Sequence, residues 1–260
     1  MNVQHFFHRA TGTLTYLVSD SGEAVIIDPV LDYKEGKLTT KSLQQVINAV
    51  KEQGLVLKYI LETHIHADHL SAALAVKGAL SGKIAISRKI TDVYDTWSSK
   101  VNCQPLAQFD VLLDEGDELS LGGEKVSVLS TPGHTPADLT YHIGDSIFVG
   151  DTLFAPKRGT GRADFPGGSA KDLYRSISRL FELPEDTDVY LCHDYPSENE
   201  EPELCSSLST QKSDNVMINT SVTEKQYIEI RTKRDSNLAT PKLLDVALPF
   251  NLTYQLPNNA

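Results

Sequence analysis

Residues 62–71 read ETHIHADHLS and contain four side chains that commonly bind metal ions. They are His64, His66, Asp68 and His69. Burying these groups without partners would cost several kcal/mol, so the fold must supply a partner for each of them. Because His64 and His66 are two residues apart, an extended segment would point both side chains the same way. The segment therefore predicts a buried metal centre, around which the rest of the chain must fold.

Three later segments place residues of the same kind directly after apolar strands. They are TPGHT with His134, VGDTLF with Asp151 and CHDY with His193. Binding residues are often found in loops at strand ends, where a rigid scaffold positions them. We therefore expect these three residues to join the first four at one site. An isolated histidine such as His8 or His142 is expected to be a packing or surface residue.

The apolar pattern predicts two strand-rich halves that each carry helices. Strands are expected at 13–19, 24–30, 57–63, 83–87, 125–131, 139–144, 146–150 and 189–192. Helices are expected at 41–52, 70–80, 89–98, after a capping Ser169, and from 221 to about 234. The polar, acidic stretch at 197–204 is expected to be an exposed loop. Two such halves favour two sheets packed face to face with helices outside.

The charge balance of the 260 residues limits the classes of partner. A net charge of -11 argues against nucleic-acid and anionic-membrane binding, which need a basic surface. The N-terminus has no apolar core or cleavage site typical of a signal peptide, and no apolar run approaches the roughly 20 residues that span a bilayer. Cys103, Cys192 and Cys205 are odd in number and widely spaced, which favours a reducing cytoplasm over a disulfide framework.

Over about residues 10–195 the chain resembles the metallo-β-lactamase superfamily. The resemblance is carried by HIHADH and by the segments TPGHT, GDTLF and CHDY. The resemblance implies an α/β (α+β) chain, folded as a four-layer αββα sandwich with the metal site along one edge of the sheets. We expect one domain over residues 1–260, with its core at 10–195 and a C-terminal extension at 196–260 that contains a helix. Asp28, in IIDPV, matches the early aspartate of the superfamily, which supports the histidine loop from behind.

Two arrangements of the ligands remain open in this superfamily. In a dinuclear zinc hydrolase, one ion would be held by His64, His66 and His134. The other would be held by Asp68, His69 and His193, with Asp151 as the bridge. Two zinc ions would lower the pKa of a shared water to about 7. Glyoxalase II, which hydrolyses thioesters, is the closest enzyme of this type.

The other arrangement uses one iron ion. His64, His134 and Asp151 form the set of two histidines and one carboxylate that is typical of non-haem Fe(II) oxygenases. Such a set leaves positions open for a substrate sulfur and for dioxygen. The remaining candidates would orient the ligands or manage protons. They are His66, Asp68, His69 and His193.

The ligand residues do not separate the two arrangements, because both families keep all seven. Longer segments around them do separate the two, because they resemble the persulfide dioxygenase (sulfur dioxygenase) family. These segments are LETHIHADHLSAA, FVGDTLFAPKRGTGRADFPGGSAKDLYRSI and LCHDY. The local match is strongest to its bacterial members named β-lactamase-like hydrolases. Glyoxalase II typically has a different, Cys-Gly-Arg-type stretch after GDTLF and a C-terminal helical domain with basic glutathione-binding residues. Here residues 194–260 follow the last candidate ligand, with one evident helix.

The resemblance implies a non-haem Fe(II) persulfide dioxygenase with one iron per chain. It would oxidise glutathione persulfide with O2 to sulfite and glutathione, as in sulfide detoxification, and the family suggests a homodimer or a higher oligomer. The alternative is the hydrolase of the glyoxalase II type with two zinc ions.

Four residues are candidates for contact with the substrate, whose glutathione part carries two carboxylates. They are Arg162, Tyr195, Lys157 and Arg158. Arginine is suited to binding carboxylates through two hydrogen bonds. Arg162 matches the GR-x-DF motif of the family best, and its alternative role is to hold the loop by pairing with Asp164 or Asp194. Lys157 and Arg158 have the alternative of being surface charges.

Overall fold

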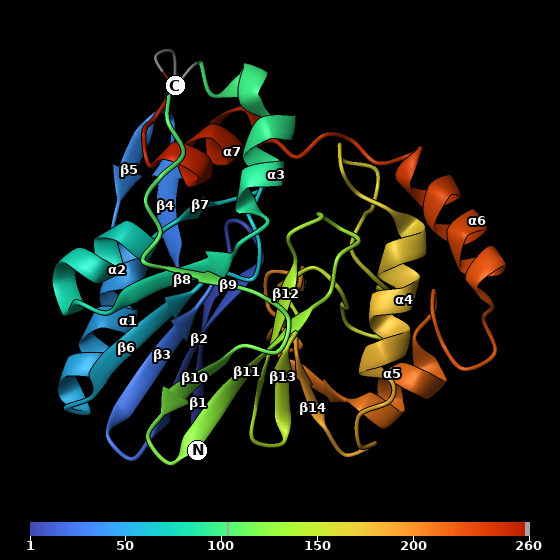
Figure 1. The fold of residues 1–260 in the computed structure, drawn as a ribbon, viewed down its shortest axis with the longest axis horizontal. Helices are drawn as coiled ribbons and strands as arrows, with labels where there is room; N and C mark the ends of the chain where they lie inside the picture. Colours follow the sequence, from blue (N-terminus) through green and yellow to red (C-terminus); the bar gives the residue numbers. More distant parts are fainter. Residues whose placement is uncertain (103, 258–260) are drawn as a thin grey trace.

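Two six-stranded sheets pack face to face in the computed structural model, which describes residues 1–102 and 104–257 (Figure 1). The N-terminal sheet has the order β1 (Asn2–His8), β2 (Thr13–Asp20), β3 (Glu23–Ile27), β6 (Val56–Leu61), β8 (Lys83–Ser87) and β9 (Val111–Leu113). The second sheet has the order β10 (Glu118–Leu121), β11 (Glu124–Ser130), β12 (Leu139–Ile143), β13 (Ser146–Phe148), β14 (Asp188–Tyr190) and β15 (Cys205–Ser207). A small third sheet has the order β5 (Lys37–Thr39), β4 (Val30–Lys34) and β7 (Leu70–Ser71).

Helices cover the outer faces of both large sheets, which confirms the expected αββα order (Figure 1). The N-terminal sheet is covered by α1 (Lys41–Glu52) and α2 (Ala73–Leu80). On the side of the second sheet lie α4 (Ala170–Leu180), α5 (Leu208–Asp214) and α6 (Glu224–Asp235). The remaining helices are α3 (Ile90–Thr96), the short 3-10 helix η1 (Ser98–Lys100) and α7 (Leu244–Thr253). Figure 1 shows α3 and α7 together at one end of the sandwich.

Alternation along the strands explains how one sheet serves two cores. Tyr16, Val18 and Val25 point into the core between the two sheets. Leu17 lies between Tyr16 and Val18, and it is paired with Ile26 of the neighbouring strand. Both side chains point outward to α1 and α2. Side chains on a strand alternate between its faces, so a sheet that is buried on both faces has a nearly continuous apolar sequence. This is why the strands expected at 13–19 and 24–30 could be predicted from their apolar sequence.

Several predicted boundaries differ from the structure. The helix predicted at 70–80 begins at Ala73, because Leu70 and Ser71 form β7 and pair with β4. The helix predicted from residue 221 begins at Glu224 and is capped by Thr223 through a capping box. The prediction for Cys103 lies outside the described residues, whereas Cys192 and Cys205 are free thiols. No helix among the described residues has the length and apolar character that crossing a membrane requires.

The described part of the extension, residues 196–257, contains three helices, where the sequence indicated one. The overlooked α7 is buried on nearly all sides and carries Pro249 in its interior. An amphipathic stripe is the main sign of a helix in a sequence, and a helix that is apolar all round has none. The extension is therefore more structured than its sequence indicates.

The topology brings the ends of five elements to one edge of the sandwich. Asp28 follows β3 and His64 lies just beyond β6, and these two strands are parallel neighbours. Asp151 and His193 follow β13 and β14, which are also parallel neighbours. His134 lies in the loop between β11 and β12. Parallel neighbours end at the same edge of a sheet, so the fold itself gathers these side chains.

Candidate metal centre

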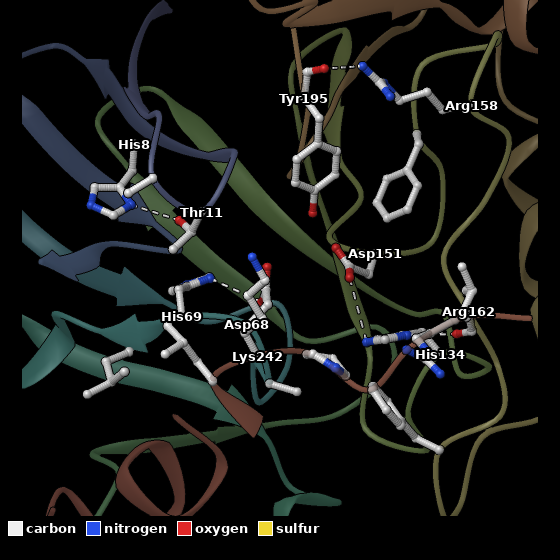
Figure 2. A pocket seen from close by; sticks show the side chains of 18 of the residues that line it. His8, Thr11, Asp68, His69, His134, Asp151, Arg158, Arg162, Tyr195 and Lys242 are labelled. Carbon is white, nitrogen blue, oxygen red and sulfur yellow. Dashed lines mark hydrogen bonds and ion pairs between the residues drawn. The ribbon is translucent and has the colours of Figure 1, made fainter. Parts of the chain in front are cut away.

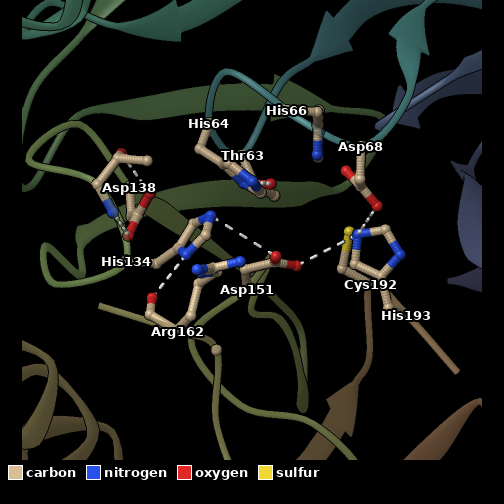
Figure 3. A network of polar contacts seen from close by, with 12 residues as sticks. Thr63, His64, His66, Asp68, His134, Asp138, Asp151, Arg162, Cys192 and His193 are labelled. Atoms are coloured by element: carbon tan, nitrogen blue, oxygen red, sulfur yellow. Dashed lines mark hydrogen bonds and ion pairs between the residues drawn. The ribbon is translucent and has the colours of Figure 1, made fainter. Parts of the chain in front are cut away.

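All seven candidate ligands converge at this edge. Figure 3 labels all of them except His69, which is labelled in Figure 2. One group consists of His64, His134 and Asp151, and a second group consists of His66, Asp68, His69 and His193. Within each group, one ligand atom per residue lies within 4.8 Å of every other. In the dinuclear arrangement predicted from the sequence, His66 and His64 bind the same zinc ion. The rings of His64 and His69 lie 4.0 and 4.1 Å from that of His66, so His66 lies between the two groups.

Asp151 lies where the two groups meet. Its Oδ2 is 3.6 Å from Nε2 of His134, and its Oδ1 is 3.3 Å from Nε2 of His193 (Figure 3). Nε2 of His193 is also 3.4 Å from Oδ2 of Asp68. One carboxylate thus faces both groups, which is the position that a bridging ligand occupies.

The start of the histidine loop is fixed by Asp28, as the resemblance implied. The Asp28 carboxylate accepts hydrogen bonds of 2.8 Å from the backbone N–H and from the hydroxyl of Thr63. Its Oδ1 also lies 3.1 Å from Nε2 of His66. Asp28 has a φ of 49°, a left-handed conformation that is uncommon outside glycine but is tolerated best by Asn and Asp. The strand therefore turns sharply here and places the carboxylate behind the loop.

Hydrogen bonds determine which ring nitrogen carries the proton in His64 and in His134. The Thr63 hydroxyl donates its only proton to Asp28, so Nδ1 of His64, 3.0 Å away, must be the donor in that contact. Nδ1 of His134 donates to the carbonyl of Arg162 over 2.7 Å. In both residues Nε2 is left as the acceptor, which is the state that binds a metal.

The loop that carries Arg162 approaches the centre closely because Gly161 has no side chain. A Cβ atom at Gly161 would lie 1.9 Å from the carbonyl oxygen of Asp151, which no packing could accommodate. The GTGR segment therefore requires glycine at this position. Its close approach brings the Arg162 carbonyl into contact with His134.

The electrostatics favour the neutral form of His64 and of His66. Burial, and then the neighbouring histidines, hold the pKa of His64 and of His66 well below the usual value. His193 differs, because Asp68 and Asp151 outweigh the effect of burial and raise its pKa. Metal ions bind the neutral imidazole, so His64 and His66 do not have to lose a proton first.

The buried atoms without a hydrogen-bond partner show that the site fits a metal ion. Among the described residues, these atoms include both ring nitrogens of His66 and of His193, Nε2 of His69 and Oδ1 of Asp151. Buried polar atoms are otherwise nearly always paired, so this concentration at one point indicates a missing partner. A set of imidazole nitrogens and carboxylate oxygens suits both zinc and iron.

The centre opens into a pocket of about 600 Å³ (Figure 2). Asp68, His69, His134 and Asp151 form its metal-facing side. Its apolar wall includes Phe154, Phe165, Leu238 and Leu243. The cationic side chains that line it are Arg158, Arg162, Arg231, Arg234 and Lys242. Apart from two candidate ligands, no carboxylate of the described residues lines this pocket. Three of the arginines pair with carboxylates behind the lining, and Arg234 and Lys242 are left as the cations without such a partner among the described residues.

Both arginines proposed from the sequence line the pocket, but each is already paired. Arg162 makes two hydrogen bonds to Asp164, of 2.6 and 2.8 Å, and lies over the ring of Phe165. Arg158 donates to Asp194 over 2.7 Å and to the carbonyl of Tyr195. The loop-holding alternative for Arg162 is thus observed with Asp164 as the partner.

The other two proposed substrate residues are placed differently from each other. Tyr195 lines the pocket, is half exposed and stacks on His193 with an interplanar angle of 3°. Lys157 does not line the pocket and forms an ion pair of 2.9 Å with Glu203. Phe154 and Arg158, its neighbours in sequence, line the pocket, whereas the Lys157 side chain is exposed outside it.

The sequence interpretation missed three basic residues of the pocket, Arg231, Arg234 and Lys242. Arg231 is buried and donates to Thr160 and to Asp235. Arg234 and Lys242 are exposed. The available signal was the segment RTKRD, in which residues 231 and 234 are three apart and share one helix face. Nothing in the sequence indicated that this face borders the metal centre.

Comparisons with known proteins agree with this geometry. A model of the Metallo-beta-lactamase superfamily matches residues 8–193. The chain is 42% identical to a probable metallo-hydrolase of Burkholderia pseudomallei strain 1710b, with 97% of this chain and 92% of that protein covered. It is 40% identical to Glyoxylase B2 of Dictyostelium discoideum, with 94% and 86% covered. It is 31% identical to the human mitochondrial persulfide dioxygenase ETHE1, with 96% and 87% covered.

Two solved structures are informative. ETHE1 from Myxococcus xanthus is similar with a TM-score of 0.79 and 32% identity, and the match covers 96% of this chain and 98% of that one. The protein TTHA1623, solved in a di-iron-bound form, is similar with a TM-score of 0.63 and 26% identity, with 83% and 100% covered. The structural similarity thus extends to relatives with different names, one of which was solved with two iron ions.

Metal binding should stabilise the fold strongly. At free zinc about 1,000 times above its dissociation constant, the free energy of unfolding should rise by about 4 kcal/mol, because the unfolded chain lacks the assembled site. His66→Ala should reduce this gain, whereas His5→Ala, at an exposed histidine, should retain it. Thermal unfolding with and without zinc measures the effect. Equal gains in the two variants would show that zinc binds elsewhere.

Proposed function

This chain belongs to the metallo-beta-lactamase superfamily, and we propose that within it the protein is a non-haem Fe(II) persulfide dioxygenase with one iron per chain. The ligand residues alone fit either metal arrangement, so the observation that carries the proposal is the similarity to ETHE1 proteins over nearly the whole chain. His64, His134 and Asp151 form the compact set of two histidines and one carboxylate that this function needs. Two of these residues line the pocket. Non-haem Fe(II) oxygenases use such a set.

The proposed reaction converts glutathione persulfide, dioxygen and water into glutathione, sulfite and a proton. The S–S bond breaks, the terminal sulfur gains three oxygen atoms and gives up four electrons, and dioxygen accepts these electrons. No external reductant is therefore required. Iron(II) held by the three residues would supply the redox chemistry with dioxygen and open positions for the substrate sulfur.

The charge of the pocket supports a small anionic substrate. The chain has a net charge of -11, yet the outer part of the pocket is lined by cationic side chains. Arg234 and Lys242 are the two that form no ion pair with a carboxylate among the described residues, so they are free to bind one. A glutathione persulfide carries two carboxylates, and charge-assisted hydrogen bonds would hold them at this rim. The terminal sulfur would then point inward toward Asp151 and His134.

The residues around the centre can also exclude water and hold a proton. Phe154 and Phe165 are aromatic walls of the pocket beside the candidate ligands. His193, whose pKa is raised by Asp68 and Asp151, can hold a proton at Nε2 within 3.4 Å of both carboxylates. A proton held there lies next to the point where sulfite and thiol are formed.

One observation favours a second candidate, a dinuclear zinc hydrolase of thioesters. Asp151 faces both ligand groups, as a bridging carboxylate would. Relatives more similar in sequence than ETHE1 are named a probable metallo-hydrolase and Glyoxylase B2. In this case His66, Asp68, His69 and His193 would all be needed to hold metal.

Oxygen dependence separates the two functions. The purified protein should produce sulfite from glutathione persulfide and consume dioxygen, since dioxygen supplies the oxidant. It should hydrolyse S-lactoylglutathione at most weakly under nitrogen. Sulfite release and oxygen uptake are followed together. Rapid thioester hydrolysis under nitrogen, without any oxygen-dependent sulfite, would favour the zinc hydrolase instead.

The two unpaired cations of the pocket among the described residues, Arg234 and Lys242, can be tested with a matched pair of variants. Lys242→Gln should raise the KM for glutathione persulfide about fivefold, because an exposed charge contact is modest, and leave kcat unchanged. Lys157→Gln removes the same charge outside the pocket and should leave both constants unchanged. Steady-state sulfite production measures both constants. An equal rise in KM in the two variants would mean that net charge, and not contact at the rim, controls binding.

A further inference from the structure

Asn251 of α7 contacts the histidine loop from the far end of the chain. Its side-chain N–H groups donate to the carbonyls of His66 and His69, each over 2.8 Å. Its side-chain oxygen accepts from the backbone N–H of Ser71, also over 2.8 Å. Asn251 is 2% exposed, so these bonds are shielded from water. One side chain thus satisfies three backbone groups of the segment 66–71.

The segment needs such support because it lacks the bonds of regular structure. Residues 64–69 belong to no helix or strand, and among the described residues their backbone groups form no hydrogen bond to another backbone group. Buried backbone N–H and C=O groups are nearly always paired in native proteins. An asparagine side chain offers two donor hydrogens and an acceptor oxygen, and here all three are used.

The helix that carries Asn251 is itself firmly held. Leu248 and Leu252 of α7 pack in one apolar cluster with Ile65 and Ala67, which alternate with the histidines of the loop. The carbonyl of Leu252 also accepts from the backbone N–H of Ala107. Figure 1 shows α7 lying beside β7, the strand that directly follows the loop. The contact of Asn251 is therefore made from a rigid element.

We propose that Asn251 is a positioning residue of the metal centre. By fixing the carbonyls of His66 and His69, it sets the directions in which His66, Asp68 and His69 present their ligand atoms. The C-terminal extension is then a structural part of the centre, although none of its residues is a candidate ligand. In the two-zinc arrangement His66, Asp68 and His69 would hold metal themselves, whereas in the one-iron arrangement they would orient the ligands or manage protons. The inference concerns the geometry of the histidine loop in either case.

The test compares two substitutions of similar shape in the same helix. Asn251→Leu removes the three bonds to the loop with little change in volume. Thr253→Val removes a buried hydroxyl that donates to the carbonyl of Pro249 within α7 and has no bond to the loop. Both full-length proteins are loaded with zinc. The zinc dissociation constant is measured by competition with a chromophoric chelator, and backbone hydrogen exchange is measured for residues 62–71.

Asn251→Leu should weaken zinc binding by about 10- to 100-fold, the usual effect of removing a group that orients ligands. The same variant should exchange faster over residues 62–71, and Thr253→Val should stay within about threefold of the unmodified protein in both measurements. Unchanged zinc affinity in Asn251→Leu, or equal weakening in both variants, would overturn the inference. If Asn251→Leu does not fold, Asn251→Asp keeps the acceptor for Ser71 but loses both donors, and the same outcomes apply to it. These measurements do not depend on the reaction catalysed.

Discussion

The rest of the site depends on the two hydrogen bonds that the Asp28 carboxylate accepts from Thr63. This carboxylate ties the end of β3 to Thr63, which lies just beyond the parallel strand β6, and so fixes where the histidine loop begins. Burial raises the pKa of this carboxyl group, while His64 and the two bonds from Thr63 act in the opposite direction. An uncompensated carboxylate at this depth would be unstable, so its partners define the local structure. Both the direction of the loop and the orientation of His64 follow from this contact.

Three parts of the chain hold the ligands from different sides. Asp28 supports the start of the histidine loop, and the carbonyl of Arg162 orients His134 from the second half. Asn251 closes the arrangement from the C-terminal extension. The extension also reaches the loop that bears Arg162, because Asp235 accepts from the backbone N–H of the next residue in that loop, Ala163. The extension therefore supports both the histidine loop and the loop whose carbonyl orients His134.

Much of this site could be predicted from the sequence, because ligand residues gathered within a few positions at strand ends have few other interpretations. The seven candidate ligands lie together as the pattern indicated, and Asp28 contacts the histidine loop as the resemblance implied. Strand 83–87 and helix 41–52 also have the predicted bounds, since each has a clear apolar period.

The pocket could not be predicted in the same way. Lys242 and Asn251 are remote in sequence, and α7 has no amphipathic pattern to mark it. Proximity in sequence was misleading for Lys157, whose side chain pairs with Glu203 outside the pocket.

The geometry offers more ligand atoms than one iron ion uses, and Asp151 could serve one ion or two. The reaction therefore depends on which metal the chain binds and in what amount. Elemental analysis of protein purified from iron-replete medium is the most direct test. The proposed dioxygenase predicts about one iron per chain with little zinc. Two zinc ions per chain and no iron would contradict it.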